Sequence, residues 1–142
     1  MTRSCPAALQ QRRFDYFWFL RQIAAVTEIS QLDASGKEQL RVSRLDRDVV
    51  GSQADFSRDP KFLQARSGKV YFGPVYFRQE SEPHMTMAVA GSGAQAGVTV
   101  VEVNLKFIRD VVSQIEVGKT CHVYVVDDRG YLIAHLDIRL DF

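Results

Sequence analysis

The spacing of apolar residues along the chain predicts helices and short strands in a definite order. Between Gln10 and Ala25, apolar residues recur at helical spacing with charged residues between them, which predicts a helix with a broad aromatic face. The apolar positions are Phe14, Phe17, Trp18, Ile23 and Ala24. Such a face usually serves packing, although on a leading helix it can also bind a partner chain.

Two β-hairpins are predicted from pairs of β-prone runs that flank a turn sequence. The first joins VTEISQLD, residues 26–33, to EQLRVSR, residues 38–44, through ASGK, whose Gly36 can adopt the positive φ of a tight turn. The second lies within CHVYVVDDRGYLIAHLDIRLDF, residues 121–142, with DDRG as its turn. Both turns have the pattern Asp-x-x-Gly, a repetition short enough to arise by chance.

The segment between the hairpins begins with a polar loop that contains one short helix. Residues 46–69 break both the helical and the strand period, and they are rich in Asp, Ser and Gly. Asp59 is suited to cap a helix, Pro60 to its first position and Gly68 to its end. Polar loops of this kind often carry binding residues.

Three extended runs follow the loop, at residues 69–79, 84–92 and 96–104, and predict an antiparallel meander. A second long helix is then predicted between Asn104, which can cap it, and Gly118, which can end it. Its apolar face consists of Phe107, Ile108, Val111, Val112 and Ile115. By Asn104 the chain has supplied five antiparallel strands and helices on one side, a complete α+β domain, so the last hairpin is left over.

Charge and hydropathy exclude several classes of partner. Lys and Arg number 18 against 17 Asp and Glu, so no overall charge favours nucleic acid or an acidic membrane surface. The most apolar run, residues 16–26, has about half of the ~20 residues that cross a bilayer, and it contains Arg21. No signal peptide is recognisable at the start, and the chain as given is expected to be soluble.

The residue types that carry most enzyme chemistry form no recognisable arrangement. Cys5 and Cys121 match no metal or redox spacing, and the three histidines match no nucleophile or metal pattern. Cys121 and His122 point to opposite faces of a strand. Asp55 and Asp59 could bind a cation, but acids in such loops usually cap turns and helices. We therefore predict no catalysis, no cofactor and no metal site.

The order and spacing of the segments resemble the double Cache family. The segments that carry the resemblance are LDASGKEQLRVSR, DFSRDPKFLQA, VYFGPVYF, MTMAVAG, GVTVVEVNLKFI and VYVVDDRGYLIAHLD. Together they run from about Arg21 to Asp137, and none of them is diagnostic alone. Members of this family are extracytoplasmic sensor modules of bacterial histidine kinases, cyclases and chemoreceptors, with two PAS-like domains along a long helix.

The resemblance implies a division of the chain. Residues 1–25 would form a leading helix, 26–104 a membrane-distal PAS-like domain with a five-stranded antiparallel sheet, and 105–117 a connecting helix. Residues 118–142 would be the first hairpin of a membrane-proximal domain that is otherwise missing, which explains the leftover hairpin. The resemblance also implies a periplasmic position in the parent protein, with membrane contact only through segments absent from this chain.

The resemblance further implies a binding pocket. Family members that bind amino acids hold the amine with an acid near the end of the last strand, where Glu102 lies, and Tyr76 falls on a tyrosine of the same pocket. The half that holds the carboxylate differs, because DPKF at residues 59–62 stands where those receptors have Arg, Pro, Trp and Tyr. Acids at 59 and 102 favour a cationic or amine ligand, a metal-bridged ligand, or none.

Each candidate residue could also have an ordinary structural role and no role in binding. Strand alternation puts Val98, Val100 and Glu102 on one face, and a buried Glu102 would need a partner. Alternatively Glu102 lies at a solvated strand end or pairs with Arg44 or Arg78.

The aromatic and methionine side chains of the meander could likewise either bind a ligand or pack in the core. The aromatic residues at 71, 72, 76 and 77 could enclose a small molecule, and Met85 and Met87 share a strand face, but both groups are common in plain cores. The residues predicted to bind a ligand are Asp59, Phe62, Tyr71, Tyr76, Met87 and Glu102.

The sequence therefore predicts a ligand-sensing extracytoplasmic domain of a signal-transduction receptor, typically a sensor histidine kinase. A small molecule would bind between the sheet and the loop at residues 50–68, and the helix at 105–117 would carry the resulting shift. The alternative is a non-catalytic PAS-like dimerisation module that binds no small molecule. A homodimer through the N-terminal helix is expected.

Overall fold

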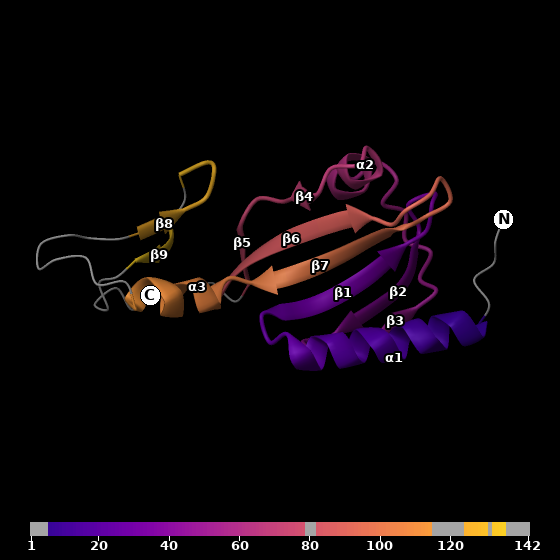
Figure 1. The fold of residues 1–142 in the computed structure, drawn as a ribbon, viewed down its shortest axis with the longest axis horizontal. Coiled ribbons are helices and arrows are strands. Elements are labelled where there is room, and N and C mark those ends of the chain that lie inside the picture. The colour runs from indigo at the N-terminus through magenta and orange to yellow at the C-terminus, as the bar shows by residue number, and fades with distance from the viewer. Residues whose placement is uncertain (1–5, 79–81, 115–123, 131, 136–142) are drawn as a thin grey trace, which may run out of the picture. The chain divides into compact units, whose positions relative to one another are not determined.

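The structure is a computed structural model that describes residues 6–78, 82–114, 124–130 and 132–135. Figure 1 shows its elements along the chain. They are α1 (Pro6–Gln22), β1 (Val26–Leu32), β2 (Glu38–Ser43), β3 (Val49–Val50), α2 (Pro60–Arg66), β4 (Tyr71–Phe72), β5 (Tyr76–Arg78), β6 (Glu82–Ala90), β7 (Val98–Asn104), α3 (Lys106–Ser113), β8 (Tyr124–Val126) and β9 (Leu132–His135).

These elements form two compact units. The first consists of residues 1–73 and 86–103, and the second of residues 74–85 and 104–142. The division into a membrane-distal domain, a connecting helix and a truncated membrane-proximal domain stays a prediction.

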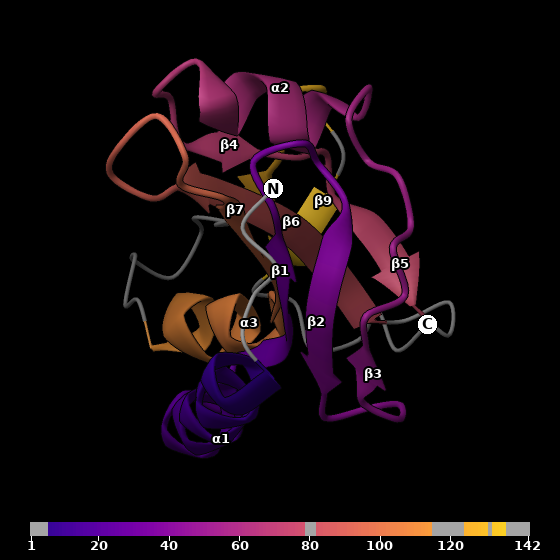
Figure 2. The same ribbon diagram turned by 90° about the vertical axis from the view of Figure 1, so that its right-hand side faces the viewer.

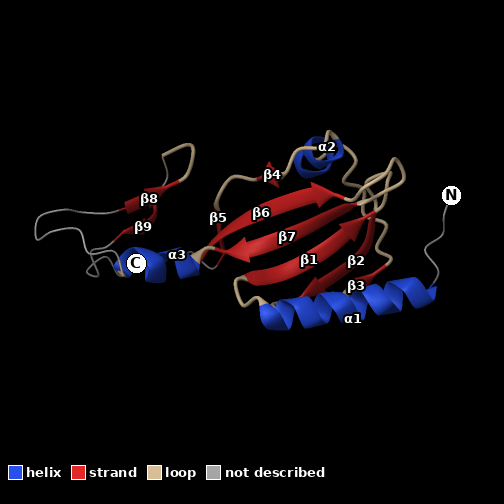
Figure 3. Ribbon diagram, in the orientation of Figure 1, coloured by secondary structure: helices blue, strands red, loops and turns tan. Residues whose placement is uncertain are grey.

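The first unit is built on an antiparallel sheet whose strand order is β3-β2-β1-β7-β6-β4 (Figure 3). β1 lies between β2 and β7 and is antiparallel to both, with Ile29 opposite Val42 on one side and Val101 on the other. The predicted first hairpin, β1 with β2, is confirmed. The order places β7 beside β1, so strands distant in sequence lie at the centre of the sheet.

Both faces of this sheet are covered by helices, as Figure 2 shows with α1 and α2 on opposite sides of the strands. On the face that we call the α1 face, the buried residues are Leu20, Val26, Ile29, Leu40 and Val42. On the opposite face, the α2 face, they are Leu32, Phe62, Ala65, Ala88, Val98 and Val100. The α+β class is thereby confirmed, with helices on both faces rather than one.

Within the described residues the sheet has seven strands, where the sequence predicted five. The run predicted at residues 69–79 is divided into β4 and β5, because Gly73 and Pro74 interrupt it and proline cannot donate a ladder hydrogen bond. Both short strands pair with β6. The two residues of β3 add a further edge by pairing with Leu40 and Arg41 of β2.

Helix α2 has the ends that the sequence predicts. The Asp59 carboxylate accepts a hydrogen bond from the backbone N–H of Lys61 at 3.0 Å, and Pro60 occupies the first turn. Gly68, just beyond the helix, has a φ of 88°, a left-handed conformation that glycine adopts without strain. Phe62 and Ala65 are the buried residues of the helix, and they press it onto the sheet.

Helix α1 packs through a different stripe from the one that the sequence emphasises. Leu9, Tyr16 and Leu20 face the sheet, and the Tyr16 hydroxyl donates to Oε1 of Gln31 at 2.8 Å. The large aromatic residues of the predicted face point away from the unit instead, with exposures of 64% for Phe14, 52% for Phe17 and 56% for Trp18.

The second unit contains the β5–β6 pairing, α3 and the hairpin of β8 with β9. The predicted last hairpin is confirmed, with Gly130 at a φ of 85° in its turn. Asn104 accepts a hydrogen bond from the backbone N–H of Lys106 at 2.8 Å, although Leu105 is the capping residue of α3. Of the predicted apolar face, Val112 is buried and Phe107 and Val111 are exposed.

Ile115 and Gly118, which the sequence assigned to the same helix, lie outside the described residues. Within the described residues, none of the helices has the length and apolarity that a membrane crossing requires.

Candidate functional site

Glu102 lies on the α2 face of β7, close to the end of the strand. Its two carboxylate oxygens are 2.9 and 2.8 Å from the Oγ1 of Thr86, which donates to them from the neighbouring strand β6. Val98 and Val100, which share the face by alternation, are fully buried, whereas Glu102 is half-buried. Along the α2 face of β7, the buried valines are thus followed by the Glu102 carboxylate, which the Thr86 hydroxyl holds in place.

A second carboxylate lies directly across from Glu102. The pairing of β1 with β7 sets Glu28 opposite Glu102, so both side chains lie on the same face of the sheet. Like charges at opposed positions repel one another, and a cation between them relieves that repulsion. Arg44, which the sequence offered as a partner for Glu102, donates to the backbone oxygens of Val26 at 3.3 Å and Ile23 at 3.4 Å.

Tyr71 brings an aromatic ring and a hydroxyl to the same face. It lies opposite Ala88 in the β4–β6 pair and packs against the apolar cluster of the α2 face. Burial raises the pKa of the Tyr71 phenol above its ordinary value of 10.0, and the negative charges of Asp59 and Glu102 raise it further. The phenol therefore lies within electrostatic reach of both predicted acids.

The effect of Asp59 and Glu102 on the Tyr71 pKa can be tested without a ligand. Glu102→Gln and Asp59→Asn are each expected to lower the pKa of Tyr71, because each removes a negative charge that disfavours the phenolate. The pKa is measured as the difference in ultraviolet phenolate titration between each protein and its Tyr71→Phe counterpart. Asp15→Asn on α1 is the matched control and should leave the pKa unchanged; an equal effect of all three would contradict the arrangement.

The raised pKa of Tyr71 also makes the stability of the folded protein depend on pH. At pH 10.0 the unfolded form has lost half of its Tyr71 protons, whereas the folded form, with its raised pKa, still keeps most of them. The contribution of this group to stability is therefore present below pH 10 and is lost as the pH rises further.

A cation and an aromatic ring meet close to Asp59. The Lys61 ammonium lies 4.1 Å from the centre of the Phe56 ring, a cation–π contact next to the start of α2. Asp59 itself is half-buried and serves as the cap of α2. Asp59 therefore has a structural role, whether or not it also contacts a ligand.

The remaining predicted residues lie in three different places. Phe62 is 7% exposed and belongs to the core beneath α2. Met87 lies on the α1 face, opposite to the face that carries its neighbour Thr86. Tyr76 belongs to the second unit, where its ring stacks on His84 with centroids 5.8 Å apart. Asp59, Tyr71 and Glu102 are thus brought together, and Met87 is not.

Sequence reasoning missed the residues that depend on strand pairing. Glu28 and Thr86 flank Glu102 only because β1 and β6 are its neighbours. Arg66, the last residue of α2, was also missed: its guanidinium donates to the backbone oxygens of Ala96 at 2.7 Å and Ala94 at 3.4 Å. This contact ties α2 to the turn between β6 and β7.

His84 is a buried polar residue of the second unit that the sequence left without a role. It is 0% exposed, and its Nδ1 lies 3.0 Å from the carbonyl oxygen of Glu82. Its Nε2 has no hydrogen-bond partner among the residues that the structure describes. In the part of the chain that the structure describes, no group of three or more His, Cys, Asp or Glu residues could hold a metal ion.

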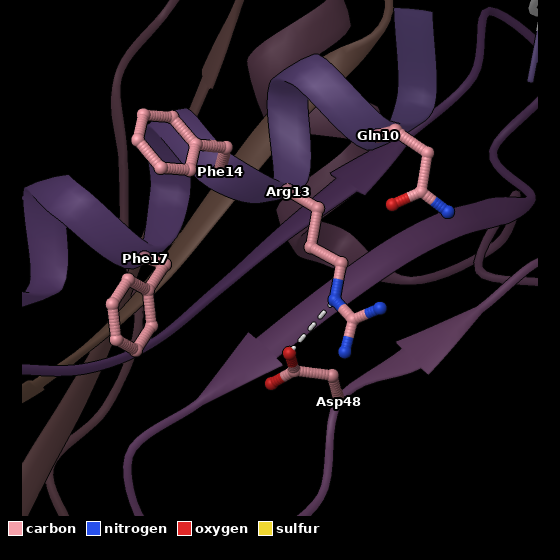
Figure 4. A pocket seen from close by; sticks show the side chains of 5 residues that line it. All are labelled: Gln10, Arg13, Phe14, Phe17 and Asp48. Carbon is pink, nitrogen blue, oxygen red and sulfur yellow. Dashed lines mark hydrogen bonds and ion pairs between the residues drawn. The ribbon is translucent and has the colours of Figure 1, made fainter. Parts of the chain in front are cut away.

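A separate hollow of about 440 Å³ opens beside α1 and is lined by Gln10, Arg13, Phe14, Phe17 and Asp48 (Figure 4). Arg13 and Asp48 form an ion pair of 3.0 Å that ties the helix to the segment after β2. The two phenylalanine rings lie along the helix beside this pair. Because their rings are largely exposed, the hollow is a surface groove and not an enclosed ligand cavity.

Comparison with solved structures identifies the fold. The sensory domain of the Campylobacter jejuni chemoreceptor Tlp3 superposes with a TM-score of 0.71 at 12% identity, over 91% of this chain and 53% of that one. The ligand-binding domain of Tlp3 in complex with L-valine gives 0.69 at 13% identity, over 94% and 56%. The extracellular domain of mmHK1S-Z2, assigned to the histidine kinases, gives 0.67 at 15% identity, over 92% and 58%.

No protein-family model matches the chain, and no curated protein matches it significantly by sequence. The structural superpositions nevertheless show that the chain has the fold of the extracytoplasmic sensor domains of chemoreceptors and histidine kinases. They confirm the PAS-like α+β class and the resemblance to double Cache modules. It spans about half the length of the structures that it matches.

Proposed function

We propose that the chain is a non-catalytic, ligand-sensing domain whose small-molecule site lies on the α2 face of the first unit. The observation that carries the proposal is the Glu102 carboxylate, which the Thr86 hydroxyl holds at 2.9 and 2.8 Å on the same sheet face as Tyr71. An aromatic surface with a few fixed polar groups is the usual composition of a small-molecule site. Thr86 fixes the Glu102 carboxylate, so the site is partly organised before a ligand binds.

The charge of the site favours a cationic or amine ligand. Glu28, Asp59 and Glu102 contribute three carboxylates, whereas the nearby cation of Lys61 lies over the Phe56 ring. Solved complexes of Tlp3 contain L-valine, L-norvaline or 4-methylisoleucine. In this chain, DPKF at residues 59–62 offers no guanidinium to a ligand carboxylate, so an amine without a carboxylate is the better match.

Signal transfer would begin at α2. Arg66 links the end of this helix to the turn between β6 and β7, and Phe62 anchors it in the core. Ligand capture would favour one position of α2 and the loop at 50–68, and β7 leads along the chain directly into α3. In the parent protein, a signal-transduction receptor such as a histidine kinase, the domain would lie on the periplasmic side of a bacterial inner membrane.

The test is ligand screening followed by substitution at Glu102. One or more members of a panel of amines, polyamines, organic acids and metal ions should raise the melting temperature, because a ligand that binds only the folded form stabilises it. For a cationic hit, Glu102→Gln is expected to weaken binding by about 1 kcal/mol or more, about fivefold in Kd, through loss of a charge-assisted contact. Titration calorimetry measures the change.

Asp15→Asn provides the matched control, since it makes the same change of charge on the exposed side of α1. Affinity that is equal in Glu102→Gln and in the unchanged chain would remove Glu102 from the site. A panel without any stabilising compound would favour the second candidate function.

The second candidate is a dimerisation module that binds nothing small. The exposed Phe14, Phe17 and Trp18 favour it, because clustered exposed aromatic residues usually mark a contact surface. On this hypothesis α1 would bind a second copy of the chain, and the PAS-like unit would only hold the helix. A homodimer is compatible with ligand sensing as well, so the two functions are separated by the ligand panel and not by the oligomeric state.

A further inference from the structure

Gly73 lies directly after β4, on the sheet face that carries Tyr71 and Glu102. Its backbone N–H donates to the carbonyl oxygen of Thr86 at 2.8 Å, which continues the pairing of β4 with β6. The residue is buried, and its φ lies outside the left-handed region. Because an alanine can adopt such a backbone without strain, the backbone conformation does not require a glycine here.

The missing side chain of Gly73 makes room for the hydroxyl end of the Tyr71 ring. A Cβ at position 73 would lie 3.2 Å from Cε1 and 3.2 Å from the hydroxyl oxygen of Tyr71, and 3.3 Å from the carbonyl oxygen of Thr86. Non-bonded carbon atoms prefer separations of about 3.5–4.0 Å, so a methyl group there would push the ring outward. Glycine is therefore needed at this position for space.

The contact with Gly73 sets the direction in which the phenol points. The ring extends from Tyr71 over Gly73, which along β6 is the direction from Ala88 to Thr86. Side chains at opposed positions of two antiparallel strands are about 5 Å apart. The phenol hydroxyl is thus set about one strand spacing from Thr86, whose own hydroxyl holds the Glu102 carboxylate. Because β4, β6 and β7 are consecutive in the sheet, these three polar groups form a row across neighbouring strands.

The Tyr71 hydroxyl is available to a ligand as a hydrogen-bond donor. It makes no hydrogen bond to any residue in the ranges that the structure describes. Burial and the charges of Asp59 and Glu102 raise the pKa of the phenol, so it keeps its proton at neutral pH. A neutral oxygen of a ligand can accept a hydrogen bond from it, whereas the same two acids would repel a ligand carboxylate.

We propose that Gly73 positions the Tyr71 hydroxyl as a second polar contact of the site, and that the ligand is an amine with a neutral oxygen, as in amino alcohols. The ammonium group would lie at the opposed carboxylates of Glu28 and Glu102, and the oxygen would accept the hydrogen bond of Tyr71. The inference rests on the proposed function, because it needs a ligand on the α2 face. It narrows the ligand class from amines in general to amines with a hydroxyl, ether or amide oxygen.

Two probes of equal charge and chain length test this ligand class. 3-Aminopropan-1-ol and butylamine differ only in a hydroxyl group that stands in place of a methyl group. In titration calorimetry, the unchanged chain should bind 3-aminopropan-1-ol more tightly than butylamine. Tyr71→Phe keeps the ring and removes the hydroxyl, so it should lower this preference about fivefold, the usual weight of one hydrogen bond.

Gly73→Ala tests the positioning role. It should lower the preference by a similar factor, and it should lower it no further in a chain that already carries Tyr71→Phe. Urea unfolding without ligand tests the packing: Gly73→Ala should lower the unfolding midpoint more in the unchanged chain than in a Tyr71→Ala chain, which has no ring to displace. Circular dichroism melts verify that each variant folds.

The possible results separate this inference from the proposed function. If neither amine binds, the amine site and this inference both fail. If both amines bind and Glu102→Gln weakens both, but Tyr71→Phe leaves their ratio unchanged, the proposed function stands and the inference is overturned. If Tyr71→Phe removes the preference and Gly73→Ala does not, the phenol contacts the ligand without help from Gly73, and the positioning role is overturned.

Discussion

Gly97→Ala is expected to lower the free energy of unfolding of the first unit by about 3 kcal/mol, the upper part of the usual range for overpacking. A Cβ at this position would collide with the carbonyl oxygen of Leu32 and would lie 2.6 Å from Nε2 of Gln31. The Leu32 oxygen cannot retreat without opening the pairing of β1 with β7, where Leu32 lies opposite Val98. Urea unfolding followed by circular dichroism measures the loss.

Gly93→Ala in the same turn is the control. Nothing lies within 4 Å of a Cβ there, but Gly93 has a φ of 100°, so the cost should be only the roughly 1–2 kcal/mol of a left-handed conformation. If Gly97→Ala unfolds at the same urea concentration as Gly93→Ala, the close approach of the turn to Leu32 is not formed in solution.

Features that depend on neighbouring residues could be predicted from the sequence. The cap at Asp59, the proline at position 60 and the terminating Gly68 define α2 within a few residues, and the structure has each of them in its predicted role. The turn that contains Gly36 fixes the first hairpin for the same reason. Such signals act over one helical turn or one tight turn, so no knowledge of the rest of the fold is needed.

Features that depend on strand pairing could not be predicted in this way. The acid at 102 could be placed on the same face as Val98 and Val100, but alternation alone does not say that Glu28 would stand opposite it. β6 carries partly apolar residues on both faces, so its sequence gave no reason to separate Met87 from the Tyr71 side of the sheet. The first question is decided by the pairing of β1 with β7, and the second by the pairing of β4 with β6, which sets Tyr71 opposite Ala88 and Phe72 opposite Met87.

The helix α1 was ambiguous for a different reason. It is apolar on more than one side, and both the stripe through Tyr16 and Leu20 and the stripe through Phe14 and Trp18 have helical spacing. Periodicity locates a helix, but it cannot choose which of two apolar stripes meets the protein's own sheet. The smaller stripe lies inward in the structure, which leaves the aromatic residues for an outside contact.

Phe62→Ala is expected to cost about 3–4 kcal/mol of unfolding free energy, as large-to-small changes in a core do. The sequence placed Phe62 among ligand-binding residues, whereas the structure buries it with Leu32, Val98 and Val100. Loss of the ring would leave a cavity under α2 and free the helix from the sheet. Chemical denaturation of the apo protein measures this effect without any ligand.

Leu63→Ala is the comparison that separates burial from helix propensity, because Leu63 follows Phe62 in α2 and is 54% exposed. Its cost should stay within about 0.5 kcal/mol, as for most surface substitutions. Phe62→Leu should retain much of the packing and cost less than Phe62→Ala, since it leaves a smaller cavity. If Phe62→Ala instead leaves the unfolding transition in place and only weakens a ligand identified in the panel, the ring faces the site and α2 is held mainly by Arg66 and Ala65.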